Sequence, residues 1–123
     1  MIADQLNLNK EKVEISASIC KVDLLSDLVG EYPELQGILG SYFAKVQGFD
    51  DDISLAIKEH YLPLGLDSKI PKKLISVAVS IVDKVDTLVG FFGIDEIKLK
   101  RSHNIVFRVL SFYVISMMML TEL

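Results

Sequence analysis

Apolar side chains recur every three or four residues along almost the whole chain, and this spacing limits the fold more than any other feature. The period matches one face of an α-helix, and no strand pattern is evident. Glycines and prolines divide the pattern into segments. We therefore predict an all-α fold with about five helices, in a chain of 123 residues that can build one modest core.

Local start and stop signals give the expected helices. The first is predicted over residues 9–30, from an N-cap at Asn9 to a terminator at Gly30, and the second over residues 33–46, beginning at Pro33. Further helices are predicted within residues 50–62, 70–93 and 100–120. The predicted core stripes are Val13, Ala17, Cys20, Leu24 and Leu28, then Ile53, Ala56, Ile57 and Tyr61, then Leu74, Val77, Ala78, Ile81, Val85 and Leu88.

Two glycines stand inside the second predicted helix. Gly37 and Gly40 lie three residues apart, so they would share one helix face. Because glycine carries no side chain, we expect another backbone to approach this face closely.

Charge restricts the classes of partner. The net charge of −4 argues against non-specific binding of nucleic acid by the whole surface. A small basic group could touch phosphates or could simply be a solvated helix end, and it consists of Lys72, Lys73, Lys98, Lys100 and Arg101.

Cysteine content and hydropathy indicate the compartment. Cys20 is the only cysteine, which fits a reducing cytosol, and its place in an apolar stripe favours a buried small residue over a nucleophile. The N-terminus has no secretory signal pattern. The apolar segment over residues 105–120 is shorter than the roughly 20 residues of a span and contains Arg108, so we expect a buried helix there and no membrane partner.

Few side chains suggest catalysis or metal binding. His60 fits a helix-end or core histidine, and His103 fits a solvated turn. No Cys/His cluster, phosphate loop or Ser/His/Asp set can be assembled, so we predict no catalytic residue and no metal ligand. Asp83 and Asp86 share a helix face that is otherwise apolar, either as a surface stripe or as carboxylates of a helical pocket.

The pattern "I-x-x-H-Y-x-P" (57–63) followed by "V-D-K-V-D" (82–86) resembles the HD superfamily of helical metal phosphohydrolases. In that superfamily, histidines and aspartates from separate helices hold divalent metals. His60 and Asp83 match such ligand positions, with Asp86 nearby, but the defining His-Asp dipeptide is absent. The resemblance therefore implies that these residues are relics of the HD fold or polar contacts, and it keeps a metal-dependent phosphohydrolase as an alternative.

Three stretches in order carry a second resemblance: "CKVDLLSDLVGEYPELQG" (20–37), "AIKEHYLP" (56–63) and "DKVDTLVGFFGI" (83–94). Together they resemble the HD-like helical domain of the beta subunit of bacterial glycyl-tRNA synthetase, over residues 1–95. This implies a cytoplasmic ligase of two alpha and two beta subunits. The alpha subunit uses ATP and Mg²⁺, the beta subunit recognises tRNA(Gly), and this chain would bind no cofactor. The polar residues of the first stretch would hold the turn, face a neighbouring domain or contact RNA: Lys21, Asp23, Glu31, Glu34 and Gln36.

Residues 96–123 depart from that family's pattern. An expected proline-containing loop is absent, and Arg108 is at best one of two expected arginines. We therefore expect a divergent C-terminal helix and a truncated fragment of a beta subunit that is inactive alone. A stand-alone helical binding module is the remaining alternative.

Overall fold

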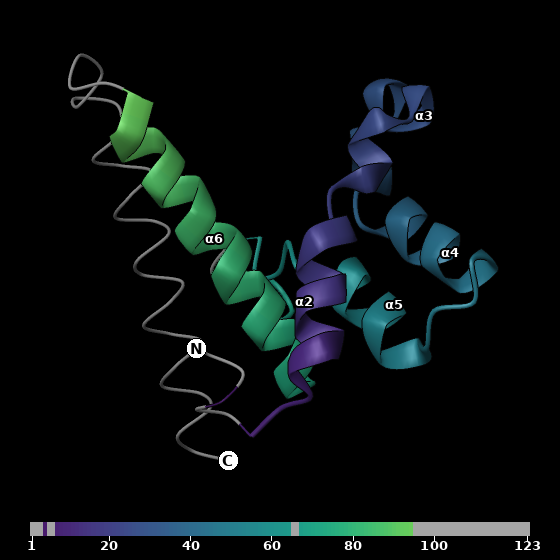
Figure 1. Ribbon diagram of the computed structural model, residues 1–123. Coiled ribbons are helices and arrows are strands. Elements are labelled where there is room, and N and C mark those ends of the chain that lie inside the picture. Colours follow the sequence, from purple (N-terminus) through teal and green to yellow (C-terminus); the bar gives the residue numbers. More distant parts are fainter. Residues whose placement is uncertain (1–3, 5–6, 65–66, 95–123) are drawn as a thin grey trace.

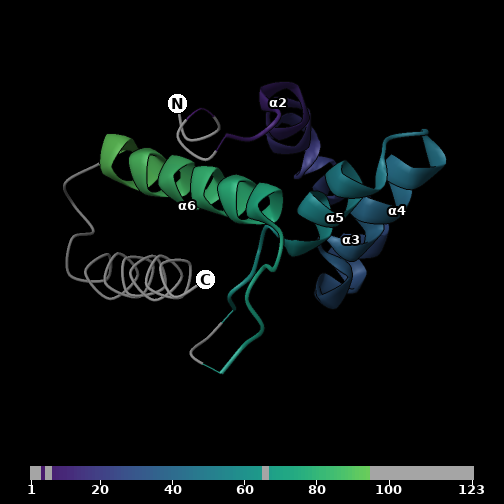
Figure 2. The same ribbon diagram turned by 90° about the horizontal axis from the view of Figure 1, so that it is seen from below.

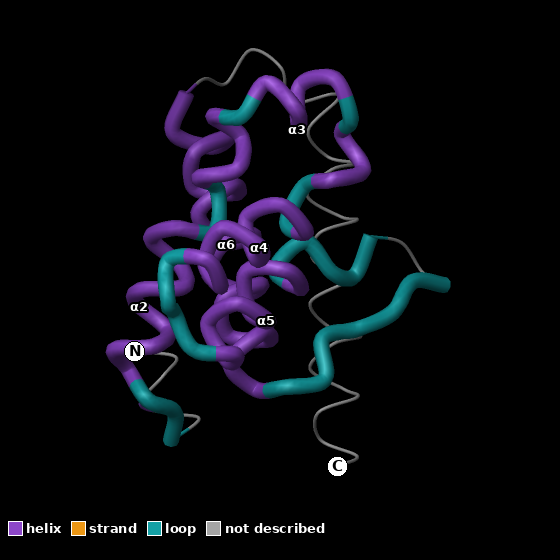
Figure 3. The backbone as a smooth tube through the Cα atoms, turned by 90° about the vertical axis from the view of Figure 1, so that its right-hand side faces the viewer, coloured by secondary structure: helices purple, strands orange, loops and turns teal. Residues whose placement is uncertain are grey.

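The computed structural model describes residues 4, 7–64 and 67–94, and in this part of the chain helices are joined by turns and loops (Figures 1 and 3). It contains five α-helices, two short 3₁₀ helices and no strand, so the all-α prediction is confirmed. The helices are α2 (Lys10–Ile19), α3 (Asp27–Glu31), α4 (Ile38–Val46), α5 (Asp51–Glu59) and α6 (Leu74–Ile94), with 3₁₀ helices η1 (Val22–Leu25) and η2 (Pro33–Leu35). The predicted helix over residues 100–120 lies outside the described residues.

Helix α5 lies at the centre of the bundle. It packs against α2, α4 and α6, and α2 also packs against α6 (Figure 1). The described parts of the connection from α5 to α6, residues 60–64 and 67–73, project away from the helices (Figure 2). The core cluster is formed by Val13, Cys20, Ala44, Ile53, Ala56, Ile57, Ile75, Ala78 and Val79.

The first predicted helix is broken in the structure. Its N-cap is correct, because the Asn9 side chain accepts a hydrogen bond from the backbone of Lys12. However, α2 ends at Ile19, and the chain continues through η1 into α3. The predicted stripe therefore holds for Val13 and Cys20 and is wrong for Leu24 and Leu28, which are about half exposed. Gly30 was predicted to end the helix, but it lies inside α3.

The second predicted helix begins later than expected. Pro33 starts the short η2, and α4 begins only at Ile38, with Gly37 as its N-cap at a φ of +77°. Gly37 and Gly40 therefore do not share a helix face. The expected close approach is nevertheless present, because a Cβ at Gly37 would lie 3.0 Å from the backbone oxygen of Lys58 in α5.

The third and fourth predicted helices correspond to α5 and α6. The Asp50 side chain caps α5, and Ile53, Ala56 and Ile57 are buried as predicted. Tyr61 is only partly buried and follows the helix. On α6 the prediction holds for Val77 and Ala78, and it is wrong for the exposed side chains of Leu74 and Val85.

The bounds of α6 also differ from those expected. The helix begins at Leu74, later than the predicted residue 70, and it continues through Gly90 and Gly93 to Ile94, one residue beyond the predicted end. Within the described ranges, no helix is long and apolar enough to cross a membrane. Residues 105–120, which were considered as a possible membrane span, lie outside the described ranges.

Candidate functional site

Three potential metal-ligating side chains meet where α2, α5 and α6 converge. Cys20 caps the end of α2, His60 caps the end of α5, and Asp83 lies in the middle of α6. One donor atom from each lies within 4.8 Å of the other two, and this is the only such group of three among the described residues. Cys20 and His60 are buried, and the Asp83 side chain is 14% exposed. We call these three residues the ligand trio.

His60 is held in one tautomer by the helix that it ends. Its Nδ1 lies 2.6 Å from the backbone oxygen of Ile57, and since a carbonyl only accepts, Nδ1 carries the proton. Its Nε2 then carries a lone pair and is buried, without a hydrogen-bond partner in the described part of the chain. Burial lowers the pKa of His60, although the Ile57 carbonyl opposes this effect. The side chain is therefore neutral near pH 7, with an acceptor nitrogen inside the protein.

Lys21 supplies positive charge to Asp83. Its Nζ lies 3.0 Å from Asp83 Oδ1 and 4.0 Å from the centre of the Tyr61 ring, so the ammonium contacts both a carboxylate and an aromatic face. Burial would lower the pKa of Lys21, but the ion pair with Asp83 outweighs it and raises the pKa. The Tyr61 ring in turn lies 3.9 Å from the His60 ring, centre to centre. These contacts connect Lys21 to the ligand trio.

Cys20 is a poor nucleophile in this setting. Burial raises the pKa of its thiol to about 11, and the negative charge of Asp83 adds to this effect. The thiol also donates to the backbone oxygen of Ala17, at 3.3 Å. Near pH 7 the group is therefore a protonated, buried thiol, consistent with the predicted small core residue.

Asp23 binds the turn that separates η2 from α4. Its Oδ2 accepts a hydrogen bond of 2.6 Å from the backbone nitrogen of Gly37, and the side chain is fully buried. An aspartate that accepts from a backbone amide makes a strong, charge-assisted bond. Its Oδ1 is buried without a partner among the described residues. Asp23 thus holds the turn, one of the roles that the resemblance implied for it.

Lys84 closes the C-terminal end of α5. Its ammonium donates to the backbone oxygens of His60 and Leu62 and to the hydroxyl of Ser80, at distances of 2.6–3.1 Å. A cation at a helix C-terminus compensates the partial negative charge there. Burial nevertheless lowers the pKa of Lys84 to about 8.

The donor types of the ligand trio would suit a transition metal better than Mg²⁺. A thiolate, an imidazole and a carboxylate together form a set that zinc accepts, whereas Mg²⁺ prefers oxygen ligands. The ammonium of Lys21 already neutralises Asp83, and the Cys20 thiol would have to lose its proton. Asp83 can therefore bind either a metal ion or the ammonium of Lys21. In the structure it contacts Lys21.

The remaining predicted residues are not brought to this cluster. Glu31 and Glu34 are exposed near α3 and η2, and Gln36 is half-buried at the same turn. Asp86 is exposed on α6, so it does not share the environment of Asp83. Their predicted contact with RNA or a neighbouring domain stays a prediction.

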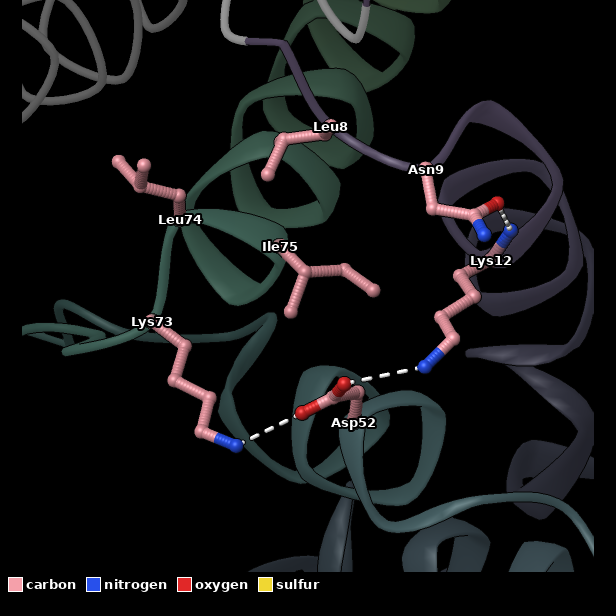
Figure 4. A pocket seen from close by; sticks show the side chains of 7 residues that line it. All are labelled: Leu8, Asn9, Lys12, Asp52, Lys73, Leu74 and Ile75. Carbon is pink, nitrogen blue, oxygen red and sulfur yellow. Dashed lines mark hydrogen bonds and ion pairs between the residues drawn. The ribbon is translucent and has the colours of Figure 1, made fainter.

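A pocket of about 360 Å³ opens at the N-terminal ends of α2 and α6 (Figure 4). Asp52 lies between two ammonium groups, 3.1 Å from Lys12 and 2.7 Å from Lys73. Leu8, Leu74 and Ile75 line the apolar side. Because Asp52 neutralises Lys73, that member of the predicted basic group is not a free phosphate contact. Residues 98, 100 and 101 of the group lie outside the described part.

Sequence reasoning missed the roles of Cys20 and Lys84 in this region. The sequence placed Cys20 in an apolar stripe but gave no sign that it would meet His60 and Asp83. Lys84 carried a weak signal, since it is the only cation in the mostly apolar segment Leu74–Ile94. A lone lysine inside an apolar helix requires acceptors for its charge.

A family model and several known proteins place this chain in the same family. Residues 1–122 match a family model described as "Glycyl-tRNA synthetase beta subunit". A relative named "Glycine--tRNA ligase beta subunit" from Rhodospirillum centenum is 50% identical over 86 residues, which cover 70% of this chain and 12% of the relative. Relatives of the same name from Thermodesulfovibrio yellowstonii and Acaryochloris marina are 47% identical over 97 residues and 39% identical over 119 residues. These matches cover 78% and 88% of this chain but only 14% and 17% of the relatives.

Proposed function

We propose that this chain, which belongs to the family of glycyl-tRNA synthetase beta subunits, contributes to tRNA recognition in the ATP-dependent attachment of glycine to tRNA(Gly). The observation that supports this proposal most strongly is the family match over residues 1–122. The chain spans less than a fifth of the length of the relatives described above. Its part in the reaction is therefore that of one region of a much larger subunit.

The proposed partners follow from the same membership. They are an alpha subunit, in an assembly of two alpha and two beta subunits, and tRNA(Gly). In this proposal the alpha subunit uses ATP and Mg²⁺, and the reaction takes place in the cytoplasm. This chain provides no catalytic residue, which agrees with a protonated Cys20 and a neutral, hydrogen-bonded His60.

We further propose that Lys21 takes the place of a metal ion at the ligand trio. Its ammonium pairs with Asp83 and lies over the Tyr61 ring, so the cluster has a cation of its own. Two cations competing for one carboxylate repel each other. This reasoning disfavours the alternative of a metal-dependent phosphohydrolase, which would need a metal at these residues.

A chimeric subunit tests the proposed role in glycine attachment. The matching 97-residue segment of the T. yellowstonii beta subunit is replaced by the corresponding segment of this chain, and the product is purified with the T. yellowstonii alpha subunit. We expect the chimera to attach glycine to tRNA(Gly), and the 123-residue chain with the same alpha subunit to be inactive. A chimera that folds and binds the alpha subunit but has lost the attachment reaction would contradict the proposal.

Metal analysis tests the role of Lys21. The chain is dialysed against Zn²⁺ or Mn²⁺, and bound metal is measured by mass spectrometry. We expect no bound metal for the wild-type chain, because Lys21 neutralises Asp83. Lys21→Gln removes the competing charge, and Asp86→Asn is the matched control at an exposed carboxylate. Stoichiometric metal in the wild-type chain that is lost in Asp83→Asn would refute the proposal.

A further inference from the structure

Helix α4 has its small side chains inside and its large apolar side chains outside. Gly40, Ser41 and Ala44 are buried, and α4 packs against α5 through this face. On the other side, Ile38 is 50%, Tyr42 62% and Val46 66% exposed. These three residues are spaced four apart, so they form one line along the helix. We call them the outer α4 stripe.

The exposed apolar surface is concentrated in this part of the molecule. Of 14 large apolar side chains that are exposed among the described residues, ten lie between Val22 and Phe49. Single exposed apolar residues are normal, but a concentration of this kind marks an interaction site. The surface helix of a protein that works alone would usually present polar residues there.

The chemistry of α4 fits a protein surface better than RNA. Lys45 is the only charged residue among its nine, and its ammonium lies 3.9 Å from the carboxylate of Asp51. Binding to nucleic acid draws a large share of its affinity from cations at phosphates. An apolar centre with polar residues such as Glu31 and Glu34 nearby in sequence is typical of a protein–protein interface.

The size of the stripe distinguishes between two protein occupants. A nine-residue helix is about 14 Å long, which is short for the roughly 800 Å² per partner of a stable association between separate molecules. A surface of the same polypeptide needs less area, because the connection gives it a high effective concentration. More than four fifths of each relative's chain lies outside the region that matches this one.

We propose that the outer α4 stripe docks against an apolar protein surface from another region of the same beta-subunit polypeptide. This inference rests on the proposed function, because it needs the chain to work within a beta subunit. The occupant would present aliphatic or aromatic side chains to Tyr42 and Val46. The two proposals fail in different ways, since docking is measured by stability and the proposed function by glycine attachment.

The T. yellowstonii chimera described above provides the test. Tyr42→Glu is introduced into the chimera and, separately, into the 123-residue chain, and thermal unfolding is followed by circular dichroism. We expect the substitution to lower the melting temperature of the chimera by several degrees and to leave that of the 123-residue chain unchanged. Glutamate is a good helix former, so helix propensity contributes little. Leu64→Glu, at a loop side chain that is 73% exposed, is the matched control and should affect neither protein.

Four results would overturn the inference. The chimera could be unaffected, or the 123-residue chain could lose as much stability as the chimera, which would mean that its own residues cover the stripe. Self-association of the 123-residue chain that Tyr42→Glu abolishes would indicate a second copy as occupant. Weaker tRNA binding without a change in stability would indicate RNA.

A second measurement tests the inference even if the chimera does not fold. A photoreactive amino acid replaces Tyr42 in the 123-residue chain, which is mixed at high concentration with a T. yellowstonii beta subunit that lacks the matching segment. Cross-links to that subunit support the inference. Cross-links only between copies of the chain, or none, overturn it.

Discussion

Replacing Gly37 with alanine should destabilise the fold more than any other single methyl addition at a described glycine. Gly37 has a φ of +77° and a ψ of −41°, a sparsely populated backbone conformation that costs a side-chain-bearing residue about 1–3 kcal/mol. The new Cβ would also lie 3.0 Å from the backbone oxygen of Lys58 and 3.3 Å from that of Ile57. Backbone atoms at a helix end cannot rotate away as a side chain can.

The same shift would disturb the hydrogen bond from the Gly37 backbone to Asp23, which is 2.6 Å long. A hydrogen bond to a charged group contributes about 1.5–3 kcal/mol, of which a displaced turn loses a part. Together with the backbone cost, Gly37→Ala should lower the free energy of unfolding by about 2–4 kcal/mol. The assay is urea unfolding followed by far-ultraviolet circular dichroism, with midpoint and slope compared.

Two other glycines separate the contributions. Gly48 has a φ of +85° but nothing within 4 Å of an added Cβ, so Gly48→Ala measures the backbone cost alone, about 1–2 kcal/mol. Gly30 lies inside α3 with open space around it, and Gly30→Ala should stabilise the chain by about 0.5–1 kcal/mol. If Gly37→Ala costs no more than Gly48→Ala, then the close approach of α5 and the bond to Asp23 do not contribute as argued.

Three further predictions concern charged groups. Asp23→Ala leaves the buried amide of Gly37 unpaired and should cost about 1–3 kcal/mol more than Asp23→Asn, whose amide oxygen can still accept, as measured by urea unfolding. Stability should rise between pH about 8 and 9, because folded Lys84 loses its proton near 8 while the unfolded side chain keeps it to 10.5. Since Lys84 is partly exposed, the rise in stability should be about 1 kcal/mol, and Lys84→Met should abolish it. Cys20 has the opposite effect at higher pH, because its pKa is raised from 9.0 to about 11 in the folded chain, so the rise should level off there. Thermal melts over this pH range measure both effects. Asp50→Ala removes the N-cap of α5 and should cost about 1 kcal/mol in the same urea assay.

Local signals predicted α5 well, because its start and its buried face depend on neighbouring residues. Ile53, Ala56 and Ile57 were identified as core from their spacing alone, and the predicted helix begins where the Asp50 side chain caps α5. The break after α2 has a different origin. Cys20 ends the helix, and Asp23 turns inward to accept the amide of a residue 14 positions later. No periodic pattern contains that contact, so Leu24 and Leu28 were predicted to be buried.

The candidate site was predicted in part. His60 and Asp83 were identified as polar positions of interest, and the structure brings them together with Cys20. The sequence could not show that Lys21 would pair with Asp83, since Lys21 lies in the turn between α2 and η1 whereas Asp83 lies on α6. Asp86 was grouped with Asp83 because both share a helix face at a spacing of three. That face turns from the core to solvent within one turn of α6, so only Asp83 contacts the cluster.

The buried Asp23 and the exposed outer α4 stripe have a common structural cause. The small residues Gly40, Ser41 and Ala44 let α4 approach α5 closely, to the point where a Cβ at Gly40 would lie 3.0 Å from the Ile57 side chain and 3.4 Å from the Asp23 carboxylate. This close packing leaves no room on the inner face for large side chains, so α4 carries them outside. The position of the outer α4 stripe therefore depends on how the turn at Gly37 holds α4 against α5. A substitution that loosens this turn should also displace the stripe from the surface against which we propose that it docks.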